Sequence, residues 1–207
     1  MPPYDTGEPT LIIVLDTSTI IRIKHRLRPG EQWHVLQYLD ELVAEGWVTF
    51  PKQVAKELED AEHPDAPGVW CVAARANRRY REPSDDTMAE VLGQYPGLLD
   101  PNAERNYADP YVVVLAYELR ERHPAREIMV ATEDVKDRPP LMSLGTACDR
   151  LGLRRLSFMG LLHALPRRDP AAERLLDDII SRLEHEAARA AMEAARIEAE
   201  RDAADGA

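Results

Sequence analysis

Four acidic side chains occupy places in the sequence that suit metal chemistry. Asp16 ends the apolar run TLIIVLD, Asp134 follows the apolar run EIMVAT, and Asp109 opens the stretch DPYVVVLAYEL. Glu57 lies within the helical pattern PKQVAKELEDAEH, next to the apolar Leu58. Carboxylates that share one cleft repel one another unless protons or cations neutralise them, and all-oxygen sites suit Mg²⁺ and Mn²⁺. Because such ions activate water and stabilise a leaving oxygen, this set of acids favours phosphodiester hydrolysis.

Each of these acids also has a purely structural interpretation. Asp16 could simply cap the helix that follows it, and its surroundings in the sequence do not separate the two roles. Glu57 borders an apolar helix face, and in isolation the pattern favours a solvated glutamate. Asp109 directly precedes Pro110, which is a helix-start signal, so its role could end there. The functional interpretation therefore requires that the folded chain bring the acids together.

The segments around the acids predict an α/β fold. Continuous aliphatic and β-branched runs are typical of parallel strands buried on both faces, and amphipathic helical patterns separate them. In such sheets, functional sites lie beyond the carboxyl ends of the strands, where Asp16 and Asp134 stand. We expect a break at RPGEQ (28–32) and a loop at 95–106. Strands are expected at 10–16, 47–50, 127–132 and 153–158, and helices at 20–25, 33–45, 51–63, 69–80, 87–94, 109–122, 145–151 and 159–165.

Composition divides the chain into three parts. A polar, proline-containing tail (1–9) precedes the α/β body (10–168), and an Ala/Glu/Arg-rich helix pattern fills residues 169–207. In residues 169–207, the apolar residues follow one another at alternating spacings of four and three residues, which is a heptad seam. This extension could dock on the body, pair with another chain or lie in solvent, and we expect its end, DAADGA, to be disordered. The seam consists of Leu176, Ile180, Leu183, Ala187, Ala190, Ala194 and Ile197.

Charge limits the partners that the protein can bind. The formal net charge of −11 over 207 residues argues against binding nucleic acid or anionic membranes by bulk attraction. A signal-peptide pattern, a membrane-length apolar run and a CxxC pair are all absent from the sequence, so we expect a cytoplasmic protein without a membrane partner. Contacts to nucleic acid would have to come from local arginines, for which the candidates are Arg75, Arg78, Arg79 and Arg138, with Arg105 as a further one.

Four segments of the chain, in their order and spacing, resemble the signatures of the PIN-domain family of metal-dependent nucleases. They are IVLDTST (13–19), VAKEL (54–58), ADPYVVVLA (108–116) and VATED (130–134). The likeness is nearest to a bacterial toxin-like subgroup, DUF4411, in which a cysteine also follows a proline-containing loop, as Cys148 does here. The resemblance covers about residues 11–165. It implies a three-layer α/β/α fold with a four- to five-stranded, mainly parallel sheet, to which the C-terminal helix is an extension.

The resemblance also implies which acids gather the metal. Asp16, Glu57 and Asp109 match the three acids that do so in the family. Asp134 matches the fourth acid, although the adjacent Glu133 could take that place. The implied cofactor is Mg²⁺ or Mn²⁺.

Hydroxyl side chains match positions that orient the acids or a bound water in the family: Thr17 or its neighbour Ser18, and also Thr132. The implied activity is that of a metal-dependent endoribonuclease, the toxin-like component of a toxin–antitoxin pair, with RNA as substrate and an antitoxin as protein partner. A homodimer, formed through the body or the C-terminal helix, is a further expectation. The alternative is a catalytically silent PIN-like module that binds RNA or a protein.

Overall fold

The computed structural model describes residues 8–59, 65–99 and 107–205 of the chain. It divides into two compact units, Met1–Leu165 and Pro166–Ala207. The first unit contains the sheet and the helices around it, and the second contains the long helix α9 (Pro170–Asp205). Among the described helices, none combines the length and the apolar character that crossing a bilayer requires.

A four-stranded sheet forms the centre of the first unit. All neighbouring strands are parallel, in the order β2-β1-β3-β4. The central strands β1 and β3 pair in register from Leu11 and Glu127 to Leu15 and Ala131. The predicted α/β class with a parallel sheet is therefore confirmed. The strands are β1 (Leu11–Leu15), β2 (Val48–Thr49), β3 (Glu127–Ala131) and β4 (Arg154–Leu156).

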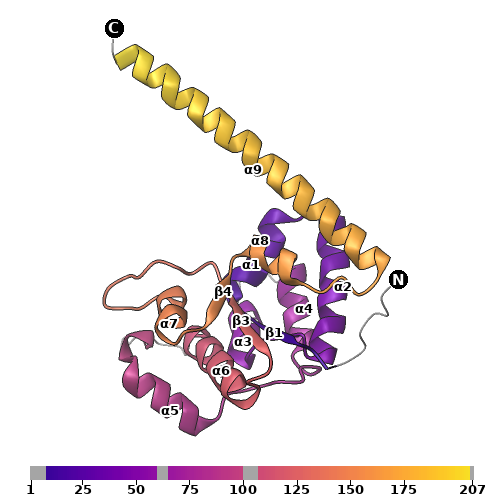
Figure 1. The fold of residues 1–207 in the computed structure, drawn as a ribbon, viewed down its shortest axis with the longest axis vertical. Helices are drawn as coiled ribbons and strands as arrows, with labels where there is room; N and C mark the ends of the chain where they lie inside the picture. The colour runs from indigo at the N-terminus through magenta and orange to yellow at the C-terminus, as the bar shows by residue number, and fades with distance from the viewer. Residues whose placement is uncertain (1–7, 60–64, 100–106, 206–207) are drawn as a thin grey trace. The chain divides into compact units, whose positions relative to one another are not determined.

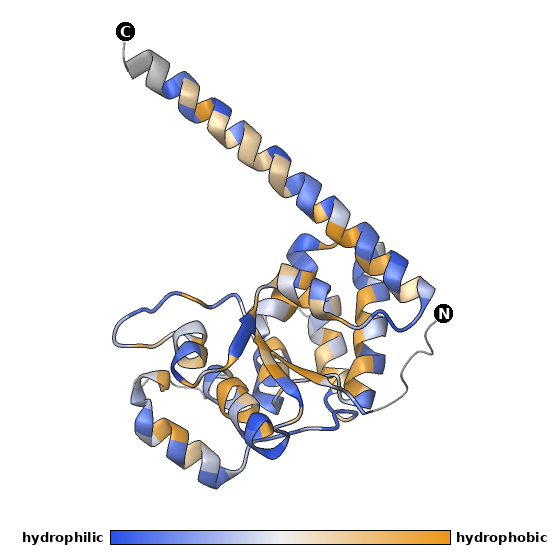
Figure 2. Cartoon of the chain, in the orientation of Figure 1, coloured by the Kyte–Doolittle hydropathy of each residue, from blue (hydrophilic) through white to orange (hydrophobic). Residues whose placement is uncertain are grey.

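The composition of each strand matches its place in the sheet. In β1, the residues from Ile12 to Leu15 are buried, as expected of a central strand with helices on both faces. The edge strand β4 instead carries the exposed Arg154 and Arg155 and is hydrophilic in Figure 2. Charged side chains on an edge strand oppose pairing with another chain.

Helices flank the sheet on both sides. On one side α1 (Thr17–Arg26), α2 (Pro29–Glu45) and α4 (Ala66–Ala74) pack together (Figure 1). On the other side, α6 (Asp109–Arg122) contacts both α5 (Asp85–Gln94) and α7 (Leu144–Arg150). The remaining elements of this unit are α3 (Lys52–Glu59), the 3₁₀ turn η1 (Pro96–Leu98) and α8 (Phe158–Ala164).

Several predicted helix boundaries are wrong, and among the described residues the two largest differences lie at the start of α2 and at the end of α4. Helix α2 begins at Pro29, within the stretch expected to be a break, because proline suits the first helical turn. There the Glu31 carboxylate accepts the Arg28 backbone N–H at 2.8 Å, which closes the first turn. Helix α4 ends at Ala74 rather than at residue 80, so the arginines from Arg75 onward follow the helix instead of extending from its surface.

The second unit is built on α9. The Asp169 carboxylate accepts the backbone N–H groups of Ala172 at 2.9 Å and Ala171 at 2.7 Å, and these bonds lower the pKa of Asp169. Arg196 pairs with Glu193 and with Glu200 along the helix, at spacings that stabilise a solvated helix. The helix continues to residue 205, into the segment 202–207 that we expected to be disordered, and residues 206–207 lie outside the described part.

Candidate functional site

Asp16 has the capping role that its sequence suggested, and its carboxylate also lies close to another acid. It follows β1 directly, is only 2% exposed, and caps the start of α1. Its carboxylate accepts hydrogen bonds from the hydroxyl groups of Ser18 and Thr132, the latter at 2.9 Å. Burial raises the pKa of Asp16, the two hydroxyl groups oppose that rise, and the nearby Glu57 adds to it. Asp16 is thus a capping residue whose charge is destabilised by its surroundings.

Glu57 reaches from α3 into the same region. One carboxylate oxygen accepts the Ala108 backbone N–H at 2.7 Å, and the other accepts the Thr17 hydroxyl. Ala108 immediately precedes Asp109, so Glu57 connects α3 both to the start of α1 and to the start of α6. The interpretation of Glu57 as a solvated helix residue does not hold in the structure.

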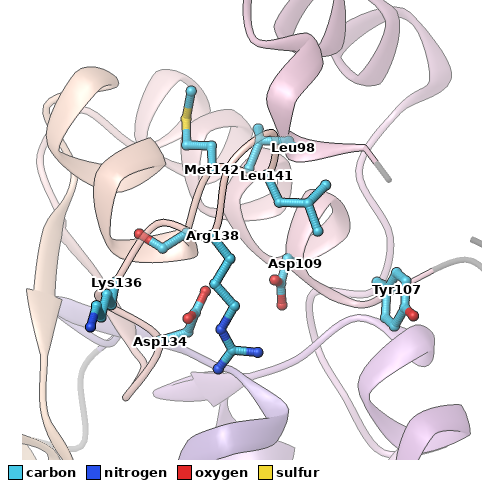
Figure 3. A pocket seen from close by; sticks show the side chains of 9 residues that line it. Leu98, Tyr107, Asp109, Asp134, Lys136, Arg138, Leu141 and Met142 are labelled. Carbon is cyan, nitrogen blue, oxygen red and sulfur yellow. The ribbon is translucent and has the colours of Figure 1, made fainter. Parts of the chain in front are cut away.

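Asp109 is the first residue of α6, and its carboxylate makes no capping bond. The N-cap is Ala108, which has no side-chain acceptor. The Asp109 side chain points instead toward a pocket that Asp134 also lines (Figure 3). Burial raises the pKa of Asp109 to about 7, and the charges of Asp16, Asp134 and Glu57 contribute to that rise. The other three acids therefore lie close enough to Asp109 to destabilise its charged form.

Asp134 and Glu133 point to different places. Asp134 lines the pocket, and its carboxylate accepts the Leu144 backbone N–H, at the start of α7, at 2.9 Å. Glu133 accepts the Phe158 backbone N–H, at the start of α8, at 2.6 Å and lies 3.8 Å from the Arg22 guanidinium. Of the two alternatives for the fourth acid, the geometry favours Asp134.

The three hydroxyl side chains singled out in the sequence each donate to an acid of the site. Thr17 donates to Glu57, while Ser18 and Thr132 donate to Asp16. A hydroxyl held in this way orients a carboxylate without neutralising its charge. These contacts are those expected of residues that position the acids.

A pocket of about 370 Å³ lies beside the acids. Two cationic side chains, Lys136 and Arg138, come to it from the loop between β3 and α7 (Figure 3). The sequence indicated Arg138 but not Lys136, although its place two residues after Asp134 could have signalled a role. The lining residues are Leu98, Tyr107, Asp109, Asp134, Lys136, Arg138, Leu141, Met142 and Ser143.

Arg78 is a structural residue, which corrects its prediction as a surface contact for nucleic acid. Its side chain is buried, with 6% of the residue exposed. The guanidinium donates to the Phe50 carbonyl, to the Arg75 carbonyl at 2.8 Å and to the Glu82 carboxylate at 3.2 Å. A phosphate could reach it only if these buried contacts were broken.

Two other predicted arginines pair with acids away from the pocket. Arg79 donates to Glu8 at 3.0 Å, next to where β1 begins, whereas Asp16 follows the end of that strand. Arg75 pairs with Glu59 at 3.3 Å on the exposed surface. Arg105 lies outside the described residues. Of the predicted arginines that the structure describes, Arg138 is thus the one that lines the pocket.

The donor set suits a divalent cation, although a ready-made cage is lacking. In the ranges that the structure describes, no three His, Cys, Asp or Glu side chains form a group that could hold a metal ion together. Mg²⁺ does not require such a cage, because it keeps several waters and binds through one or two carboxylates and a substrate phosphate. Asp109 and Asp134 face one pocket, and Asp16 and Glu57 add to the negative charge there. Oxygen ligands with unbalanced charge are the chemistry that such an ion requires.

Comparisons of the chain with protein-family models, with curated proteins and with solved structures found no match. A function for this site must therefore be argued from its own chemistry.

Proposed function

We propose that this protein is a PIN-like endoribonuclease that uses Mg²⁺ or Mn²⁺ to hydrolyse phosphodiester bonds at the pocket beside Asp109 and Asp134. One observation carries the proposal: acids from four separate segments meet at the carboxyl edge of the sheet. Throughout the described part of the chain, every hydrogen bond to these acids comes from a hydroxyl or a backbone N–H. A cluster of acids held only by such groups is costly to the folded protein, because the charges repel one another and burial disfavours them.

Each group of side chains has a definite task in this proposal. Asp16 and Asp109 would hold the cation, and Glu57 and Asp134 would contact it directly or through water. A divalent cation held by these acids would supply a more acidic bound water and stabilise charge on the leaving oxygen. The hydroxyl groups keep the acids in place, and Lys136 would attract the substrate phosphate to the pocket. This arrangement requires no histidine or lysine as a general base.

The cellular role is proposed from the resemblance of the sequence motifs. It comprises a cytoplasmic, toxin-like nuclease, RNA as the target and an antitoxin as the partner. The competing function is a silent PIN-like module that binds RNA or a protein without cutting. The presence of all four acids favours catalysis over the silent module, because binding alone would not need their unbalanced charge.

A pair of variants on one helix tests the proposal. Glu57 faces the site from α3, whereas Glu59 on the same helix is exposed and pairs with Arg75. We expect wild-type protein to cleave single-stranded RNA with Mn²⁺ or Mg²⁺ and not with EDTA. Glu57→Gln should reduce cleavage at least about 10-fold, because it removes one of the charges that balance the cation. Glu59→Gln should cleave like wild type.

A second measurement does not depend on catalysis. Mn²⁺ should raise the melting temperature of wild type and of Glu59→Gln, because a ligand that binds only the folded state stabilises it. The same addition should have little effect on Asp16→Asn. RNA binding with no metal-dependent cleavage and no effect of Mn²⁺ on melting would support the silent module and contradict the nuclease.

A further inference from the structure

The pocket has two chemically different sides. Asp109 and Asp134 form its acidic side (Figure 3). Across from them stands an apolar wall, which consists of Leu98, Leu141 and Met142. Phosphodiester hydrolysis needs the acids and a phosphate contact, but it does not need an apolar surface of this kind. We therefore expect the apolar wall to contact a part of the substrate that is itself apolar.

The apolar wall is held in place by backbone hydrogen bonds from two segments that are distant in the sequence. Met142 donates its N–H to the Gly97 carbonyl at 2.8 Å, which joins the loop after β3 to the turn η1. Within the loop, Arg138 and Leu141 exchange two backbone hydrogen bonds, of 3.1 and 2.8 Å. A surface formed before the ligand arrives loses little conformational entropy when the ligand binds.

Aromatic and cationic side chains complete the pocket. Tyr107 lines it and is 52% exposed, so a flat ligand can reach its ring. Lys136 and Arg138 bring two positive charges to the same space. Exposed aromatic rings and cations in one site are the combination by which proteins bind single-stranded nucleic acids, with bases stacked and phosphates attracted.

The size of the pocket limits what can enter. Its volume of about 370 Å³ lies near the lower end of the roughly 300–1,000 Å³ typical of small-molecule sites. Such a space suits a single nucleotide rather than a duplex. In a duplex each base is also stacked on both sides and paired along its edge, so its faces cannot contact the wall or the tyrosine.

We infer that the pocket holds one unpaired nucleotide of a single strand, with its base between the apolar wall and Tyr107 and its phosphate beside Lys136 and Arg138. This inference rests on the proposed function, since it names the part of the substrate that positions the scissile bond before the acids. It makes Leu98, Leu141, Met142 and Tyr107 the residues that determine specificity. Cleavage then occurs at a constant distance from the seated base and requires that base to be unpaired.

Binding measurements with modified RNA test this inference without any need for cleavage. Fluorescence anisotropy of the Asp16→Asn protein in Mg²⁺ would compare a labelled 12-nucleotide single strand with the same strand in a duplex. We expect the single strand to bind at least about 10-fold more tightly, because loss of stacking on one base costs about 10- to 100-fold in affinity. When a single abasic site is moved along the strand, we expect one position at which it lowers the binding affinity by a similar factor.

Variants connect that position to the pocket. Tyr107→Ala and Met142→Ala should weaken binding of the intact strand about 10-fold and should leave the affinity for the abasic strand unchanged. Tyr107 is half exposed, so its replacement tests the inference even if Met142→Ala fails to fold. The matched control is Leu99→Ala, because Leu99 follows the wall residue Leu98, is 46% exposed and does not line the pocket.

The outcomes for the inference and for the proposed function can be told apart. Equal affinity for single strand and duplex, or an abasic scan without a sensitive position, would overturn the nucleotide pocket even if the wild type cuts RNA. A sensitive position that disappears in Tyr107→Ala would support the pocket even if wild type cuts nothing, in which case the nuclease proposal alone fails.

Discussion

The acidic side chains at the two ends of the sheet have different kinds of partners. At the end where β1 and β3 begin, acids meet cations: Glu8 pairs with Arg79 at 3.0 Å and with Arg126. At the end where these strands finish, the acids around Asp16 and Asp109 meet hydroxyl groups, backbone N–H groups and one another. The first end is thus balanced by arginines, whereas at the second, acidic end the hydrogen bonds to Asp16, Glu57 and Asp134 come from hydroxyl and backbone N–H groups, and the cations Lys136 and Arg138 line the pocket nearby.

The pKa values show what this difference means. A hydrogen bond from Arg79 lowers the pKa of Glu8 and so stabilises its charged form, with the charge of Arg126 helping. Burial and neighbouring acids raise the pKa of Asp109 to about 7 and so destabilise its charged form. Strongly perturbed groups of this kind cluster at functional sites, because they need a ligand or a proton to be satisfied. The comparison separates an end where the charged form of an acid is stabilised from an end where the charged forms of Asp16 and Asp109 are destabilised.

The largest effect should come from removing a charge at the acidic end. Asp109→Asn should reduce metal-dependent RNA cleavage by about 10³-fold, because the cation loses a ligand on which several kcal/mol of transition-state stabilisation depend. The control is Asp149→Asn, since Asp149 is an exposed acid that pairs with Arg155 on the surface. Initial rates with Mn²⁺ measure the effect, and undiminished cleavage by Asp109→Asn would refute the metal assignment.

The same substitution should change how stability depends on pH. The pKa of Asp109 is about 7 in the folded protein and about 3.9 in the unfolded chain, so the folded state binds more protons between these values. The metal-free protein should therefore lose stability as pH rises from about 4 to 7, by on the order of 3 kcal/mol from this group. Asp109→Asn should remove that loss and be the more stable protein at pH 8. Urea unfolding in EDTA at several pH values measures the free energy of unfolding of wild type and of Asp109→Asn. The same dependence of this free energy on pH in both proteins would contradict the prediction.

A smaller effect should follow from crowding the backbone that carries Asp134. A Cβ at Gly145 would stand 2.9 Å from the Val135 Cα and 3.0 Å from the Asp134 carbonyl oxygen, so Gly145→Ala must displace that segment. We expect a destabilisation of about 2 kcal/mol, as for other overpacked sites, together with weaker cleavage. Gly93→Ala is the control, because nothing lies within 4 Å of the added atom and alanine favours the helix α5. Equal stability of Gly145→Ala and Gly93→Ala would show that the backbone at Asp134 and Val135 accommodates the added Cβ, and would contradict the prediction.

The smallest effect belongs to the balanced end of the sheet. Glu8→Gln removes the acid shared by Arg79 and Arg126. Because exposed ion pairs contribute little, the melting temperature should change by less than about 2 °C and RNA cleavage should not change. Added salt should reduce even this difference. A loss of activity comparable to that of Asp109→Asn would erase the distinction between the two ends.

Local sequence patterns were sufficient for the fold and for part of the site. Continuous apolar runs predicted the parallel strands, because strands buried on both faces exclude polar side chains. The acids that follow strands, Asp16 and Asp134, were placed at the carboxyl edge of the sheet because chain direction alone decides which end of a parallel strand they occupy. The start of α6 at Asp109 followed from Pro110, whose ring restricts the backbone locally. All of these are effects of neighbours in the chain.

Only the tertiary structure decided the remaining assignments, because they depend on contacts between residues far apart in the sequence. Glu57 lies beside the other acids since Thr17 and the Ala108 N–H, 40 and 51 residues away, hold its carboxylate. Arg78 is excluded because Phe50 covers it, and no pattern within a charged run reveals burial. The sequence by itself therefore determined which acids follow the strands at one edge of the sheet. Packing determined which of them share a pocket, and with what neighbours.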